Sequence, residues 1–151
     1  MIYFYLIMLK TPLFIWIFIT IVIVAMLHFS ALQFYLYWRF WWFDLLTHFL
    51  GGLWVAISFL WLFFQFGFVN IFKNNKNYNL LVAFFGSLFV GVFWEIFEYY
   101  FGLTAVNASN YVIDTVTDIS FGLVGGFAAY CIFVFKGYHK VEFNKNSSQK
   151  E

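Results

Sequence analysis

Residues 12–29 read PLFIWIFITIVIVAMLHF, an apolar run without a charged side chain. A helix that crosses the hydrocarbon core of a bilayer needs about 20 such residues at a rise of ~1.5 Å each. Pro12 suits the first position of a helix, where its missing N–H costs nothing. The run therefore predicts a membrane span. A cleaved signal peptide is the competing interpretation, which we do not favour because residues 1–9 are also apolar and no small-residue cleavage pattern follows His28.

Three further runs of the same kind follow along the chain. They cover residues 43–66, 80–101 and 112–135, so the prediction is an all-α polytopic membrane protein with four transmembrane helices in one domain, residues 1–135. Between the first two lies an aromatic connector, ALQFYLYWRFWW, of the kind that collects at the membrane–water interface. Residues 136–151 form a polar tail, which we expect in the cytoplasm.

The composition agrees with a membrane location. Of the 151 residues, 64% are hydrophobic and 10% are charged, which leaves too little polar surface to cover a soluble globule. The net charge of +1 excludes the basic footprint of a nucleic-acid-binding protein. We expect membrane lipids as partners, and a homo-oligomer is compatible with the sequence.

The basic residues predict the orientation, because loops on the cytoplasmic side carry an excess of Lys and Arg. With four spans and a cytoplasmic N-terminus, Arg39 alone faces outside. The cytoplasmic side then holds Lys10, Lys73, Lys76, Lys136, Lys140, Lys145 and Lys150. We therefore expect an N-in/C-in protein of the cell membrane.

Acidic residues gather near the outer ends of three predicted spans. An ionised side chain inside a bilayer is costly unless it faces protein or water. The expected deeper layer is His48, Glu95 and Asp118, and the expected supporting layer is Asp44, Glu98 and Asp114, with His28 joining from the first span. Within each span the members are three or four residues apart, so they share one helix face.

Small residues continue the same faces deeper into the membrane. Ser87 and Gly91 precede Glu95, Gly122 and Gly126 follow Asp118, and Gly51 follows His48. Small residues at this spacing allow membrane helices to approach closely. The carboxylates are therefore expected between packed helices, with the large apolar side chains facing lipid.

Clustered carboxylates and imidazole are typical ligands of divalent cations, and the histidines favour Zn, Mn or Fe over Ca or Mg. Without a cation the carboxylates would repel one another. The alternative is a purely structural network in which the acids and His48 hydrogen-bond one another, with Arg39 as counter-ion. A channel is disfavoured because the inner halves of the spans carry no charged residue.

Three motifs occur in order: DLLTHFLGG at residues 44–52, WEIFE at 94–98 and DTVTD at 114–118. Together they resemble the YjdF-like bacterial integral membrane proteins and, more distantly, the VanZ-like proteins. The likeness covers residues 40–128. It implies a compact helical membrane protein of unassigned biochemistry, and the VanZ-like members imply a connection with glycopeptide resistance and the cell envelope. That family pattern often has a further acid one turn below Asp118, where this chain has Gly122.

The resulting functional hypothesis is a membrane protein with an outward-facing Asp/Glu/His site that binds a divalent metal cation and acts on a lipid or lipid-linked envelope molecule. The alternative hypothesis is a non-enzymatic scaffold or envelope-resistance factor with a structural polar cluster. No nucleophile motif stands out, so the residues leave open whether the site is catalytic.

Overall fold

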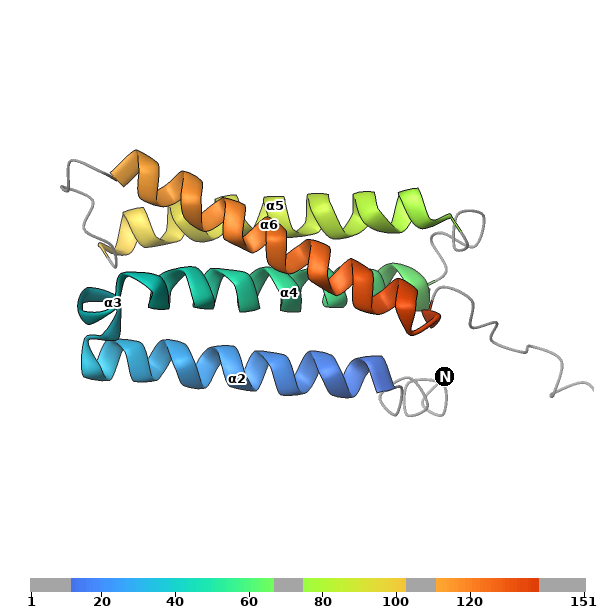
Figure 1. Cartoon of the computed structure of the whole chain (residues 1–151), viewed down its shortest axis with the longest axis horizontal. Helices are drawn as coiled ribbons and strands as arrows, with labels where there is room; N and C mark the ends of the chain where they lie inside the picture. The colour runs from blue at the N-terminus through green and yellow to red at the C-terminus, as the bar shows by residue number, and fades with distance from the viewer. Residues whose placement is uncertain (1–11, 67–74, 103–110, 139–151) are drawn as a thin grey trace, which may run out of the picture.

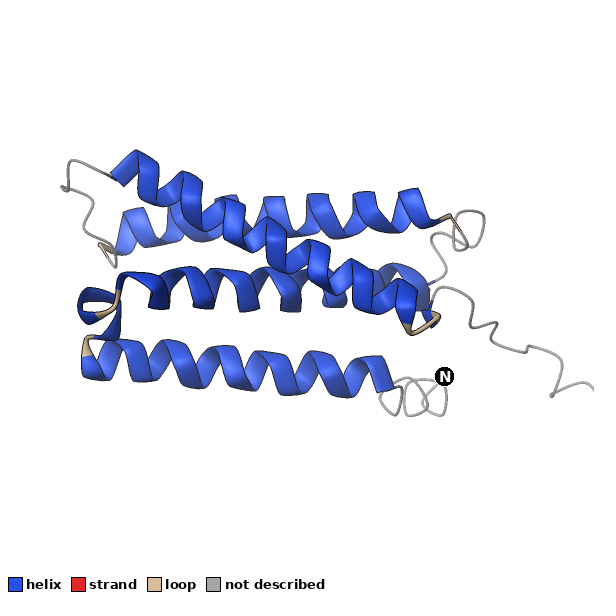
Figure 2. Cartoon of the chain, in the orientation of Figure 1, coloured by secondary structure: helices blue, strands red, loops and turns tan. Residues whose placement is uncertain are grey.

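The computed structural model describes residues 12–66, 75–102 and 111–138. The described chain is helical apart from short turns (Figure 2). Its long helices are α2 (Pro12–Phe34), α4 (Trp41–Phe66), α5 (Lys76–Phe101) and α6 (Tyr111–Phe135), and the short α3 (Leu36–Arg39) joins α2 to α4 (Figure 1). By length and composition, four helices can cross a membrane. The prediction of an all-α protein with four candidate membrane spans is confirmed.

The helices extend beyond the predicted spans, by one or two residues at the starts of α4 and α6 and by four or five residues at two other ends. α2 continues to Phe34, into the predicted connector, and α5 begins at Lys76 rather than at residue 80. Asn75 caps α5, because its side-chain oxygen accepts hydrogen bonds from the backbone N–H of Asn77 (3.0 Å) and Tyr78 (3.4 Å). Such polar caps are invisible to a hydropathy window, which explains the early start.

The turn after α2 depends on one unusual backbone conformation. Tyr35 has φ of 56°, in the left-handed region that non-glycine residues rarely adopt. Tyr35 breaks the helix there, and α3 then bends across the end of the bundle instead of continuing α2 (Figure 1). Tyr37 on α3 is thereby carried toward the other helices.

α4 occupies the centre of the bundle and packs against α2, α5 and α6 (Figure 1). α6 crosses α4 at very close range. A Cβ atom added at Gly52 would overlap the backbone of Gly122, and one added at Gly125 would overlap the backbone of Phe49. A Cβ at Gly122 itself would have its nearest neighbour at 3.7 Å, the carbonyl oxygen of His48. The two closest approaches of α4 and α6 are therefore Gly52 to Gly122 and Gly125 to Phe49. Gly125 was not among the small residues predicted to pack.

The apolar core lies at the end of the bundle where α5 begins. Its buried members come from all four long helices: Leu13, Ala56, Ile57, Leu60, Ala83, Ala129 and Phe133. Outside this core many large side chains are exposed, among them Met26, Phe85 and Phe127. A soluble monomer rarely exposes so much contiguous apolar surface, whereas a membrane would cover it.

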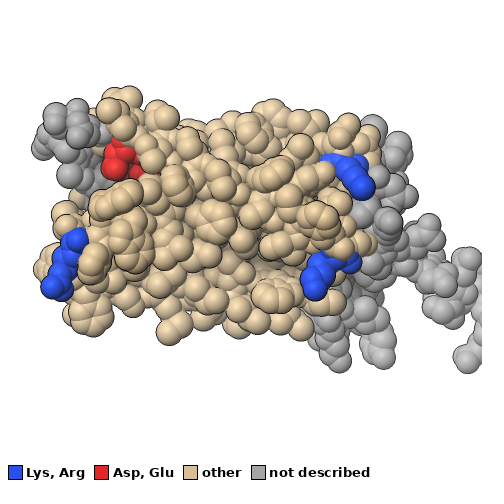
Figure 3. Space-filling model, viewed as in Figure 1, with Lys and Arg blue, Asp and Glu red and all other residues tan. Residues whose placement is uncertain are grey.

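The described charged residues are divided between the two ends of the bundle (Figure 3). Lys76 and Lys136 lie at the core end, and Arg39 lies on α3 at the opposite end of the bundle. Lys10, Lys73, Lys140, Lys145 and Lys150 lie outside the described residues. The N-in/C-in orientation stays a prediction, and in it the α3 end faces outward.

Candidate functional site

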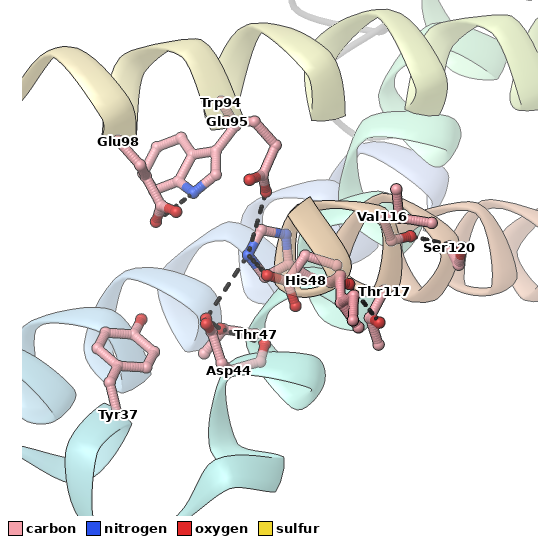
Figure 4. Close-up of polar contacts among 12 residues, drawn as sticks. Tyr37, Asp44, Thr47, His48, Trp94, Glu95, Glu98, Val116, Thr117 and Ser120 are labelled. Atoms are coloured by element: carbon pink, nitrogen blue, oxygen red, sulfur yellow. Dashed lines mark hydrogen bonds and ion pairs between the residues drawn. The ribbon is translucent and has the colours of Figure 1, made fainter. Parts of the chain in front are cut away.

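The acids and His48 come together at the α3 end of the bundle, one or more from each of α4, α5 and α6 (Figure 4). His48 and Asp118 each lie seven residues after the start of their helix, and Glu95 lies six residues before the end of α5. At ~1.5 Å per residue these side chains start about 10 Å inside the helix ends. In the predicted membrane arrangement, this depth corresponds to the boundary between the lipid headgroups and the hydrocarbon core.

One nitrogen atom of His48 faces three carboxylates from three helices. Its Nε2 lies 3.5 Å from Oδ1 of Asp44, 3.8 Å from Oε1 of Glu95 and 3.9 Å from Oδ2 of Asp118 (Figure 4). The side chains of His48 and Glu95 are each 8% exposed, and that of Asp118 is 2% exposed. The three predicted ligands of the deeper layer, His48, Glu95 and Asp118, thus share one buried centre. Asp44 is at least as close to Nε2 of His48 as Glu95 and Asp118 are.

These separations are longer than hydrogen bonds, which join N and O at about 2.7–3.2 Å. They match the spacing of two atoms that bind the same ion. Ligands about 2.1 Å from a tetrahedral metal ion are about 3.4 Å from each other. Two groups of residues bring their ligand atoms within 4.8 Å of one another: Asp44, His48 and Asp118, and His48, Glu95 and Glu98. The geometry is that of a possible metal centre around His48.

Several buried oxygens of the centre lack a hydrogen-bond partner within the described chain. They are Oε1 of Glu95, Oε2 of Glu98 and Oδ1 of Asp118. Leaving a buried acceptor unpaired costs free energy, and an uncompensated carboxylate costs more. Arg39, the counter-ion of the structural alternative, is exposed and forms no ion pair with an acid in the part of the chain that is described. The site therefore needs a positive charge or protons that its described neighbours do not provide.

The remaining predicted residues occupy different positions. Glu98 is buried and accepts a hydrogen bond of 2.8 Å from Nε1 of Trp94 (Figure 4). Asp114 is exposed and belongs to neither group of candidate ligands. His28 also lies outside both groups, and its Nδ1 is hydrogen-bonded to the hydroxyl of Tyr37 at 2.8 Å.

Tyr37 was not predicted as a site residue, because the sequence places it in an aromatic connector. The fold brings it beside the acids (Figure 4). Burial raises the pKa of its hydroxyl to about 12, with a smaller contribution from the negative charges of Asp44 and Glu98 against the lowering effect of a hydrogen bond with Thr47. Tyr37 is therefore a neutral hydrogen-bonding group at any physiological pH.

Trp94 was also missed, although a signal for it exists. It precedes Glu98 by four residues, the spacing at which side chains meet on one face of a helix. No comparable signal exists for Tyr37, whose position depends on the turn at Tyr35.

A cavity of about 170 Å³ lies against the site and is partly open. Its polar wall includes His28, Tyr37, Asp44, His48, Glu98 and Asp118. The other wall is apolar and comes from all four long helices: Ile21, Val24, Val55, Val90, Gly91 and Ile119. The centre thus borders a space in which a small group can approach it.

The comparisons with known proteins bear on the family. A family model described as Predicted membrane protein (DUF2238) matches residues 1–139. No curated protein and no solved structure matches the chain. The match covers all four long helices and every residue of the site. The chain therefore belongs to the DUF2238 family of predicted membrane proteins.

Proposed function

We propose that this protein binds one divalent transition-metal ion at the centre around His48 and uses it to act on a lipid or a lipid-linked envelope molecule. The observation that carries the proposal is the arrangement of Nε2 of His48 between Asp44, Glu95 and Asp118 at 3.5–3.9 Å. Four acids and one imidazole that have no Lys or Arg partner among the described residues are more readily explained by a bound cation than by helix packing alone.

The donor set favours Zn²⁺, Mn²⁺ or Fe²⁺. Mg²⁺ and Ca²⁺ prefer sites made of oxygen ligands only, whereas an imidazole nitrogen suits the transition metals. Asp44, His48 and Asp118 would supply ligands from α4 and α6, and His48, Glu95 and Glu98 form the other combination. Trp94 would hold Glu98 in place through its hydrogen bond of 2.8 Å, as outer-shell donors commonly do for metal-binding carboxylates.

The depth of the centre supports a lipid as the molecule acted on. A cation about 10 Å inside the helix ends is within reach of phosphate and ester oxygens of lipid headgroups. A bound metal ion polarises such oxygens as a Lewis acid. The resemblance to YjdF-like and VanZ-like proteins is consistent with a role in the cell envelope, and the lysine distribution supports placing the centre in the outer half of the cell membrane.

A structural polar cluster in a scaffold protein is the second candidate. The hydrogen bond between His28 and Tyr37 favours it, because it ties α2 to α3. The two candidates differ in whether the protein depends on a metal ion.

The proposal is tested by thermal unfolding in mild detergent with and without a chelator. A ligand present at 100–1,000 times its Kd stabilises the folded state by about 2.7–4.1 kcal/mol, so removal of a tightly bound ion should lower the melting temperature clearly. The loss should be larger at pH 8 than at pH 5, because at pH 5 protons can replace the cation among the carboxylates.

Glu95→Gln should abolish the chelator effect, while Asp114→Asn, a matched change outside both ligand groups, should retain it. If melting of the wild-type protein is indifferent to chelator and to added Zn²⁺, Mn²⁺ and Fe²⁺ at both pH values, the metal proposal fails and the scaffold interpretation replaces it.

A further inference from the structure

We infer that the cavity beside the centre holds the first part of a single lipid chain, which enters from the membrane between α2 and α5, with the headgroup turned toward the acids. The headgroup part of this inference rests on the proposed metal site, and the chain part rests on the cavity itself. The substrate class is thus a membrane lipid or lipid-linked molecule bound with its chain inside the bundle, not a water-soluble molecule that docks from outside.

The lining of the cavity changes character with depth. The acids and Tyr37 lie at the α3 end, whereas the apolar wall is deeper: Ile21 comes seven residues before His28 on α2, and Val55 comes seven residues after His48 on α4. At ~1.5 Å per residue, this apolar part extends about 10 Å farther into the membrane than the histidines. The cavity thus has a polar end and an apolar end along the bilayer normal. This arrangement suits a lipid in its ordinary membrane orientation, with the headgroup at the polar end and the chain in the apolar part.

One weakly packed side of the cavity lies between α2 and α5. Both helices line the cavity, but each packs mainly against other helices, and the contact between them is slight. Their described link is the edge-to-face contact of the His28 and Trp94 rings, whose centroids are 5.6 Å apart. Trp94 is 37% exposed. Because both helices carry exposed apolar side chains, the medium outside this gap is the lipid chain region.

The size of the cavity fits part of a chain. Apolar cavities of about 150 Å³ admit a molecule the size of benzene, that is, about six carbon atoms. The cavity of about 170 Å³ therefore accommodates a headgroup-proximal segment of similar size, and the rest of the chain would remain in the bilayer. Water is a poor occupant of the apolar part, because it would find few polar partners there.

Substitution of either of two glycines by a larger residue should fill the cavity without disturbing the fold. Gly91 on α5 and Gly51 on α4 both line it, and a Cβ added at either position meets no atom within 4 Å. A leucine at either position would project into the space assigned to the lipid chain. Val92, which neighbours Gly91 but is exposed, gives a matched control in Val92→Leu.

The experiment uses the full chain in bilayer nanodiscs of phosphatidylethanolamine and phosphatidylglycerol. A phosphatidylglycerol probe carries a photoactivatable diazirine near the headgroup end of one chain, and cross-linked peptides are mapped by mass spectrometry. In the wild-type protein the probe should label residues of the apolar wall, such as Ile21 and Val90. Labelling there should fall about ten-fold or more in Gly91→Leu and in Gly51→Leu, and should be unchanged in Val92→Leu.

Metal content is measured on the same samples, which separates the two proposals. Lost labelling with retained metal in the glycine variants supports the chain site. Labelling that depends on Gly91 in a protein without metal supports the chain site and overturns the metal proposal. Wild-type labelling confined to exposed residues, or equal labelling in all variants, overturns the chain site. Unfolding of both glycine variants would also overturn it, since an open cavity should accommodate the added side chains.

Discussion

Gly125→Ala tests the close crossing of α4 and α6, on which the geometry of the centre depends. The added methyl group would overlap the backbone of Phe49, which cannot move away as a flexible side chain could. The two helices would have to separate, and His48 on α4 would move relative to Asp118 on α6. Gly122→Ala is the matched change, because its Cβ would meet only the carbonyl oxygen of His48 at an ordinary contact distance of 3.7 Å.

The magnitude follows from two opposing effects. Alanine is favoured over glycine inside a helix by about 1 kcal/mol, and this gain is common to both variants. Forcing an extra carbon into a packed contact costs about 1–3 kcal/mol. We therefore expect Gly122→Ala to be neutral or stabilising by up to about 1 kcal/mol, and Gly125→Ala to be about 1–3 kcal/mol less stable than Gly122→Ala.

The difference can be measured by equilibrium unfolding of both variants in mixed micelles of a mild detergent and dodecyl sulfate, followed by circular dichroism. Subtracting the free energy of unfolding of one variant from that of the other removes the helix-propensity contribution, which both share, and leaves the cost of the steric overlap. Equal stabilities for the two variants, or a less stable Gly122→Ala, would refute the close contact between Gly125 and the backbone of Phe49.

Two further predictions concern topology and Tyr37. In a Cys131→Ser background, a cysteine replacing Trp38 should react with an impermeant thiol reagent in intact cells, whereas a cysteine replacing Asn77 should not. The reason is that these two exposed residues lie at opposite ends of the bundle. The reverse labelling pattern would contradict the N-in/C-in orientation. Tyr37→Phe removes the hydrogen bond to His28 and should lower the free energy of unfolding by about 1 kcal/mol. Burial raises the pKa of Tyr37 to about 12, whereas an unfolded tyrosine titrates at pH ~10, so at pH 10 ionisation favours the unfolded wild-type chain but not the unfolded variant. The loss should therefore be smaller at pH 10 than at pH 8 by about 0.4 kcal/mol, and an equal or larger loss at pH 10 in paired unfolding titrations would contradict it.

The spans and the gathering of Asp, Glu and His side chains at one end of the bundle could be predicted from the sequence because both depend on local rules. Runs of about 20 apolar residues decide the spans, and the spacing of Glu95 and Glu98, or of Asp44 and His48, places each pair on one helix face. The high cost of an acid in a bilayer then requires these faces to meet inside the bundle. The prediction used only helix periodicity and burial, and these are strong constraints in a membrane protein.

The remaining features depend on contacts between helices, which the sequence does not specify locally. No sequence pattern around Tyr35 indicates a left-handed backbone conformation, so the approach of Tyr37 to the acids could not be predicted. The division into a deeper and a supporting layer used axial position alone, whereas side-chain length brings Asp44 and Glu98 to His48 as well. The role of Gly125 depends on the crossing point of α4 and α6, which spacing within one helix does not reveal.

The central claim is that His48 organises a metal centre, and elemental analysis of the purified protein tests it most directly. The wild-type protein, purified in mild detergent without added metal, should contain about one Zn, Mn or Fe ion per chain. His48→Ala should remove this metal, whereas His28→Gln, a change to the other histidine of the cavity, should retain it because His28 belongs to neither ligand group. A wild-type protein without stoichiometric metal, or a His48→Ala variant that keeps it, would contradict the claim.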